Sequence, residues 1–163
     1  MNRGSTLFLK IAVFIIGIPV LALCIFLLPQ IATVAIEEAK KGSELAYMVF
    51  AILIVMYVST IPFYLALYQA LSLLSYIDKN QAFSELSVRA LKKIKNCAIT
   101  ISGLYVVVLP FIFIIAEWDD APGLALIGMV IIGASLVIAV FAAVLQRLLQ
   151  EAIDIKSEND LIV

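Results

Sequence analysis

Four long stretches of this sequence contain no charged residue. They are residues 11–36, 45–77, 96–116 and 121–146. Each is longer than the roughly 20 apolar residues that an α-helix needs to cross the hydrocarbon core of a bilayer. A typical soluble domain carries about 25% charged residues, whereas this chain carries 14% and is 64% hydrophobic. The sequence therefore predicts an all-α integral membrane protein, a four-helix bundle that forms a single domain over residues 1–163.

The expected spans do not coincide fully with the uncharged runs. We expect them at about residues 9–35, 47–74, 97–116 and 122–146. At 1.5 Å per residue the second run exceeds the thickness of a bilayer, so residues 72–77 should project from the membrane or the helix should tilt. The fourth helix should likewise continue past Gln146, into a tail of residues 147–163 that carries charged side chains.

The first run has one competing interpretation, as a cleaved secretory signal. Arg3 and Lys10 flank its start, and residues 21–24 read Leu-Ala-Leu-Cys, which resembles a lipoprotein-processing site. However, Leu23 stands where a small residue is needed before the cysteine, and the apolar run continues beyond Cys24. We therefore interpret this run as a membrane helix that is retained.

Lysine and arginine residues indicate the direction of the spans. Residues 78–95, between the second and third spans, are rich in them, and Arg3 and Lys10 lie near the N-terminus. By contrast, residues 37–44 balance two lysines with three glutamates, and residues 117–120 are acidic around one tryptophan. Because Lys and Arg accumulate in cytoplasmic loops, we expect both termini and the central loop to be cytoplasmic.

Residues 84–96 of the central loop predict a cytoplasmic amphipathic helix. Ser84 can cap its start, with Phe83 placed for a hydrophobic staple. On a helical wheel the basic side chains gather opposite the apolar ones; they are Arg89, Lys92, Lys93 and Lys95. Such a helix can lie among the lipid headgroups and then bend into the third span. The alternative is that Phe83, Ser84 and the four basic residues form a docking surface for a protein partner.

The second span is the most polar of the four. Tyr57, Thr60, Tyr64 and Tyr68 fall within one narrow arc, and Pro62 interrupts the same helix and should kink it. The hydroxyl groups can simply join neighbouring helices through hydrogen bonds. The alternative is a small-molecule or lipid pocket at the kink. We favour packing.

Small residues mark the fourth span. Ser135, Ala139 and Ala143 follow one another at four-residue spacing, which lets two helix backbones approach closely. We expect this contact to lie within the bundle, although oligomeric state cannot be derived from the sequence.

Several classes of chemistry are not supported by the sequence. The chain contains no histidine, which removes Ser-His and Cys-His nucleophile pairs and histidine metal sites. Its two cysteines, Cys24 and Cys97, are too far apart in the predicted topology for a disulfide. No span carries a central charge, as ion-coupled transporters usually require. We therefore expect no enzyme activity, no cofactor, no metal site and no direct binding of nucleic acid.

The C-terminal tail is opposite in charge to the central loop. Its acidic residues are Glu151, Asp154, Glu158 and Asp160.

A few short motifs of the central loop and the tail resemble those of a known family. They are Phe83-Ser84, followed by Val88, Leu91 and Ile94, and residues 158–161, which read Glu-Asn-Asp-Leu. Through these motifs the chain resembles the bacterial "domain of unknown function 2975" family over nearly its whole length. This resemblance implies a small membrane protein of bacteria with no established enzymatic activity, often encoded beside a small helix-turn-helix regulator.

Two classes of function follow as hypotheses. The first is a regulatory or scaffold protein of the bacterial cytoplasmic membrane that docks a cytosolic protein, with the basic residues of the loop and Glu158 and Asp160 of the tail as candidate contacts. The second is a component of a small transporter or channel, or a protein that binds a lipid or small molecule. In either case membrane lipids are partners.

Overall fold

The structure, a computed structural model, describes residues 3–42, 44–118 and 120–162, and they are almost entirely helical. The elements are α1 (Arg3–Ala22), a π-helical turn η1 (Leu23–Leu27), α2 (Leu28–Lys40), α3 (Leu45–Asp78), α4 (Glu85–Trp118) and α5 (Pro122–Ile162). Four helical segments are long and apolar enough to cross a membrane: Gly4–Lys40, Leu45–Asp78, Glu85–Trp118 and Pro122–Asn159. The prediction of an all-α protein with four apolar helices of spanning length is therefore confirmed.

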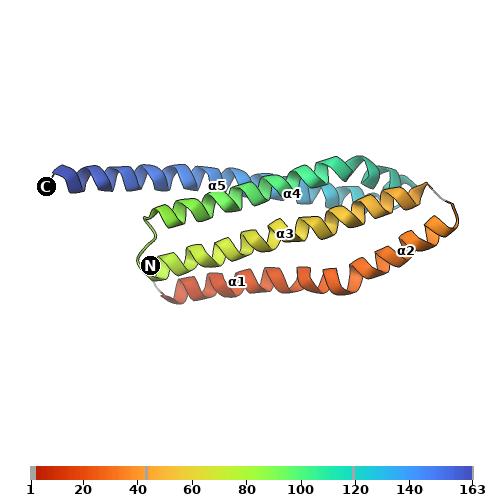
Figure 1. The fold of residues 1–163 in the computed structure, drawn as a ribbon, viewed down its shortest axis with the longest axis horizontal. Helices are drawn as coiled ribbons and strands as arrows, with labels where there is room; N and C mark the ends of the chain where they lie inside the picture. Colours follow the sequence, from red (N-terminus) through yellow and green to blue (C-terminus); the bar gives the residue numbers. More distant parts are fainter. Residues whose placement is uncertain (1–2, 43, 119, 163) are drawn as a thin grey trace.

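The first span is one rod made of α1, η1 and α2, and it changes direction where α1 gives way to α2 (Figure 1). Prolines explain this irregularity. Pro29 has no N–H for the carbonyl of Ile25, one turn earlier. Just before it, the Leu28 N–H bonds to the Leu23 carbonyl, five residues back, which is the π-helical pattern. We call the three elements together the first rod.

The helices pack in chain order. The first rod lies on α3, α3 lies on α4, and α4 lies on α5. Because successive helices run in opposite directions, the start of α1, the connection between α3 and α4, and the C-terminal part of α5 lie at one end (Figure 1). We call this the lysine-rich end, because the basic residues of α4 lie there.

The contact between α4 and α5 is built from small residues. Ala125, Ser135, Ala139 and Ala142 are buried along α5. A Cβ atom added to Gly128 would lie 3.2 Å from Leu109 Cδ1, so a side chain of α4 packs directly against the backbone of α5 here. Ser135 and Ala139 thus occupy the close contact within the chain, as expected, and the next buried position is Ala142, with Ala143 only partly covered.

The expected bend between a surface helix and the third span is not found. Residues 85–118 form one continuous α-helix, so the basic segment is the first three turns of α4. No proline or glycine lies between the two parts, and the buried side of the helix continues from Val88 and Leu91 to Ala98 and Ser102. The helix therefore keeps packing against its neighbours instead of turning into the headgroup plane. In the same way, α5 continues as a helix to Ile162 and projects beyond the other helices (Figure 1).

Candidate functional site at the lysine-rich end

The basic residues of α4 divide between two surroundings. Arg89, Lys92 and Lys93 are exposed, whereas Lys95 is partly covered. The opposite side of these turns is buried: Ser87 and Ala90 are almost fully covered by neighbouring parts of the chain. The predicted separation of basic and apolar side chains is thus present, but the apolar side packs within the protein.

The connection before α4 holds its first turn through hydrogen bonds to Gln81. The Ser84 hydroxyl donates to the Gln81 carbonyl at 2.6 Å, and the Ser87 hydroxyl donates to the same oxygen at 3.2 Å. The Ser84 side chain therefore does not cap α4 by accepting a backbone N–H, as the sequence suggested; its carbonyl accepts the Ser87 and Val88 N–H groups instead. Phe83 is 62% exposed, which leaves its ring on the surface.

The tail forms the far part of α5. The Gln150 amide donates to Glu85 at 3.2 Å and to Asp154 at 3.2 Å, which fixes α5 beside the first turn of α4. Glu151 and Glu158 are exposed, and the side chain of Asp160 lies outside the described part of the structure. The tail also exposes apolar side chains: Ile155 is 58% and Leu161 83% exposed.

The structure brings the basic and acidic groups to the same end without pairing them. Within the described residues, ion pairs join Lys10 to Asp78 and Lys41 to Glu38. None there joins the basic residues of α4 to the acidic residues of α5. Both sets of charge therefore face solvent or a further molecule.

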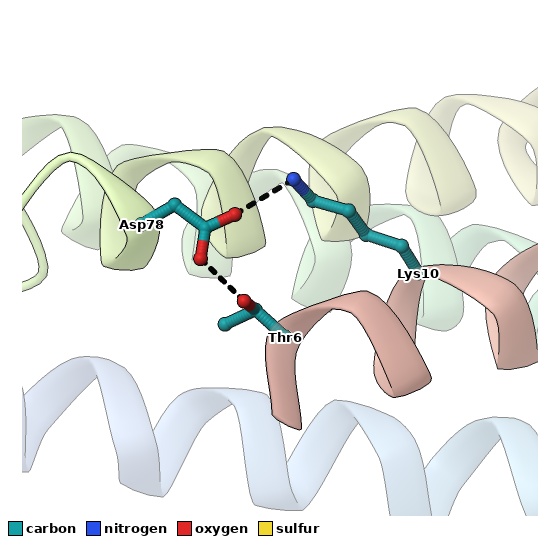
Figure 2. Close-up of polar contacts among 3 residues, drawn as sticks. All are labelled: Thr6, Lys10 and Asp78. Atoms are coloured by element: carbon teal, nitrogen blue, oxygen red, sulfur yellow. Dashed lines mark hydrogen bonds and ion pairs between the residues drawn. The ribbon is translucent and has the colours of Figure 1, made fainter. Parts of the chain in front are cut away.

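A polar cluster that sequence reasoning missed ties the first rod to α3. The Lys10 Nζ lies 2.8 Å from Asp78 Oδ2, and the Thr6 hydroxyl donates to the other oxygen of the same carboxylate (Figure 2). Thr6 is fully buried, and the side chains of Lys10 and Asp78 are 32% and 23% exposed. A signal existed, because Lys10 precedes the first uncharged run and Asp78 follows the second, so antiparallel helices place both at one end.

Two residues of the polar stripe of α3 bond to the first rod. The Tyr64 hydroxyl donates to the Gly17 carbonyl at 2.9 Å, and the Tyr57 hydroxyl donates to the Cys24 carbonyl at 3.4 Å. Thr60 bonds to the Tyr57 carbonyl of its own helix. A Cβ atom added to Gly17 would lie 3.2 Å from Leu67 Cδ1, so the rod and α3 are close here.

The rest of the stripe is less engaged. Tyr68 is 64% exposed, and Pro62 lies inside α3 without ending the helix. The interhelical bonds of Tyr57 and Tyr64 agree with packing, while a ligand at this position stays a prediction.

A shallow groove lies between α4 and α5 near the lysine-rich end. Its volume is about 400 Å³, and it is lined by Lys95, Ala143, Gln146, Arg147, Gln150 and Glu151. A second, more apolar depression of about 330 Å³ adjoins it and is lined by Val140, Ala143, Val144, Arg147 and Leu148. The two share Ala143 and Arg147, so they form one continuous surface feature, which we call the α4–α5 groove.

The described residues do not form a metal-binding cluster. In residues 3–42, 44–118 and 120–162, no three Cys, Asp or Glu side chains are close enough to hold a metal ion. Cys24 and Cys97 are both free thiols. The chemistry that the structure does present is therefore surface charge at the lysine-rich end.

Comparison with known proteins agrees with these features. The family described as "Protein of unknown function (DUF2975)" matches residues 33–163. The chain is 63% identical over all 163 residues to the "Uncharacterized membrane protein YoaS" of Bacillus subtilis (strain 168), with both chains covered completely. No solved structure matches the chain.

Proposed function

Because this membrane protein belongs to the DUF2975 family of proteins of unknown function, we propose a role from its own surface: it is a non-enzymatic protein of the bacterial cytoplasmic membrane that docks a cytosolic protein at its lysine-rich end. A small helix-turn-helix regulator is the partner that we propose to test first. In this proposal the membrane spans are an anchor and the lysine-rich end is the working surface.

The direction of insertion in this proposal is supported by charge. The lysine-rich end carries Lys10, Lys79, Arg89 and the three lysines of α4, whereas the opposite end carries a mixed connection and an acidic one. Such a bias supports a cytoplasmic location of the lysine-rich end. The start of α1 and the end of α5, which lie at that end, would then be cytoplasmic as well.

The observation that carries the proposal is the projection of α5, whose described acidic side chains form no ion pair with α4. From the Gln150 contact with Glu85 onward, α5 continues to Ile162 beyond the start of α4. A helix of these twelve residues is about 18 Å long at 1.5 Å per residue. It presents exposed carboxylates and the exposed Ile155 and Leu161, while the neighbouring α4 presents exposed cations. Complementary patches of this kind guide protein association and give it specificity.

The proposal is tested by reversing charge at the lysine-rich end. Arg89→Glu combined with Lys93→Glu should release a bound partner, since both side chains are exposed. The matched control is Lys40→Glu combined with Lys41→Glu at the opposite end, which changes charge by the same amount.

The readout begins with site-specific photocrosslinking in living cells from position 86, which is close in sequence to the altered residues. The crosslinked protein is then identified, and its binding to the purified membrane protein is titrated at low salt, where surface charges are less screened. Loss of binding in the first variant and retention in the control supports docking. Equal binding by the wild type and both variants, or the absence of any specific crosslink, contradicts it.

A further inference from the structure

The α4–α5 groove lies where the protein surface changes from apolar to charged. The uncharged run of α5 ends at Gln146 and is followed by Arg147, and the uncharged run of α4 begins directly after Lys95. In a membrane this level corresponds to the boundary between acyl chains and headgroups. We infer that the groove binds one phospholipid with an anionic, hydroxyl-bearing headgroup of the phosphatidylglycerol type, in the leaflet at the lysine-rich end.

Two cations, Lys95 and Arg147, converge on the groove. Side chains of a helix lean toward its N-terminus. Since α4 and α5 run in opposite directions, Lys95 leans toward the lysine-rich end and Arg147 leans toward the membrane, so the two approach the same level from opposite sides. Both line the groove, and neither has an ion-pair partner among the described residues. A phosphodiester would provide the missing negative charge, and a guanidinium matches its geometry.

The polar groups around the cations favour a headgroup with hydroxyl groups. Glu151 also lines the groove, so the charge of its lining is two positive groups against one negative. A carboxylate repels phosphate but accepts hydrogen bonds, and a glycerol headgroup has hydroxyl groups to donate. The Gln150 amide already donates to Glu85 and Asp154, which leaves the amide of Gln146 as a further donor that lines the groove. One net positive charge suits a lipid with a single negative charge.

The second depression provides a place for an acyl chain. Val140, Val144 and Leu148 follow one another at four-residue spacing on one strip of α5, and they are 62%, 49% and 55% exposed. The strip leads from Arg147 toward the middle of the span and is predominantly apolar. A lipid can therefore place its phosphate beside Arg147 and lay one chain along this strip. A soluble phosphate compound would use only the first half of the groove.

The experiment measures lipid binding to the full-length protein after delipidation in a neutral detergent. Native mass spectrometry follows titration with dioleoyl phosphatidylglycerol, and separately with dioleoyl phosphatidylcholine, dioleoyl phosphatidylethanolamine and water-soluble glycerol phosphate. The test variant is Lys95→Gln combined with Arg147→Gln. The control is Lys93→Gln combined with Arg89→Gln, which removes the same two residue types from the exposed side of α4.

The wild type should bind one phosphatidylglycerol molecule more tightly than either zwitterionic lipid, and glycerol phosphate should not displace it. Charged hydrogen bonds contribute about 1.5–3 kcal/mol, so the test variant should bind at least about tenfold more weakly while the control changes less than about twofold. Equal affinity for the three lipids, displacement by glycerol phosphate, or equal losses in both variants would overturn the inference. Thermal unfolding in the same detergent identifies a misfolded double variant, in which case Arg147→Gln alone replaces it, paired with Arg89→Gln.

Lipid binding in the groove and protein docking can be tested separately. The docking variant alters Arg89 and Lys93, which do not line the groove, and the lipid variant leaves both unchanged. Loss of partner binding with intact lipid binding in the docking variant, and the reverse in the lipid variant, would separate the two surfaces.

Discussion

Lys10 and Asp78, which are 68 residues apart in the sequence, form an ion pair of 2.8 Å that joins the first rod to the last turn of α3. The same carboxylate accepts a hydrogen bond from the fully buried Thr6 (Figure 2). The two residues belong to two long apolar helical segments, and the pair neutralises one charge on each of them. The ion pair therefore attaches the first rod to α3, and it also lowers the free-energy cost of placing two charged residues close to the membrane.

Asp78→Asn should destabilise the protein more than loss of an ordinary surface ion pair. The substitution removes the negative charge that pairs with the partly covered Lys10. The free energy of unfolding should therefore fall by about 1–2 kcal/mol. The control is Glu38→Gln, because Glu38 and Lys41 are 3.9 Å apart and the Lys41 side chain is 71% exposed. Thermal unfolding in detergent should show a clear decrease in Tm for Asp78→Asn and almost no decrease for Glu38→Gln. Equal decreases would contradict a stabilising role of the Lys10–Asp78 pair.

Tyr64→Phe should weaken attachment of the first rod slightly. The change removes the hydroxyl that donates to the Gly17 carbonyl and keeps the ring, so the expected loss is about 0.6 kcal/mol, typical of hydrogen bonds between membrane helices. Tyr68→Phe is the control, since Tyr68 is 64% exposed.

Partner and lipid binding by both tyrosine variants should equal that of the wild type if the stripe serves packing. Loss of a cellular phenotype in Tyr64→Phe at normal stability and abundance would instead support a ligand pocket beside Pro62.

Gly128→Leu should disturb the contact between α4 and α5. A Cβ atom at this position would already be 3.2 Å from Leu109 Cδ1 and 3.4 Å from Ile112 Cδ1, and overpacking typically costs about 1–3 kcal/mol. Gly133 lies on the same helix with no heavy atom within 4 Å of an added Cβ, so Gly133→Leu is a matched control. Denaturation monitored by circular dichroism should separate the two variants, and similar unfolding curves would show that the helices are not this close.

Cysteine labelling in intact cells tests the direction of insertion. In a Cys24→Ser and Cys97→Ser background, a membrane-impermeant maleimide should modify Lys41→Cys but not Asn80→Cys or Asn159→Cys, because the lysine-rich end is expected inside. All three should react after the membrane is permeabilised. Labelling of Asn80→Cys and Asn159→Cys in intact cells would reverse the proposed topology.

The number of helices could be predicted because the information is local. Each uncharged run is bounded by charged residues that cannot lie at the centre of a bilayer at low cost. Positions such as Glu44 and Glu117 therefore delimit the runs from the sequence alone. The length of α5 was also foreseeable, since residues 147–162 contain no proline or glycine to end it.

Features that depend on neighbouring helices could not be predicted in the same way. The amphipathic pattern of residues 84–96 fits a helix on a membrane surface as well as a helix whose apolar side packs within the protein. The structure selects the second, because Val88 and Leu91 are buried by the rest of the chain. The bond from the Tyr57 hydroxyl to the Cys24 carbonyl joins α3 to the π-helical turn. Pro29 accounts for the turn, but no residue type identifies Tyr57 as the partner of this carbonyl.

The first rod packs mainly on α3, whereas α3 and α4 each have a packed helix on both sides. Its described polar attachments lie at separate levels, around Lys10, Gly17 and Cys24. A pulling force applied at the N-terminus would break these attachments one after another, beginning with those of Thr6 and Lys10. Mechanical extraction should therefore proceed in small steps along the first rod before the close contact between α4 and α5 yields.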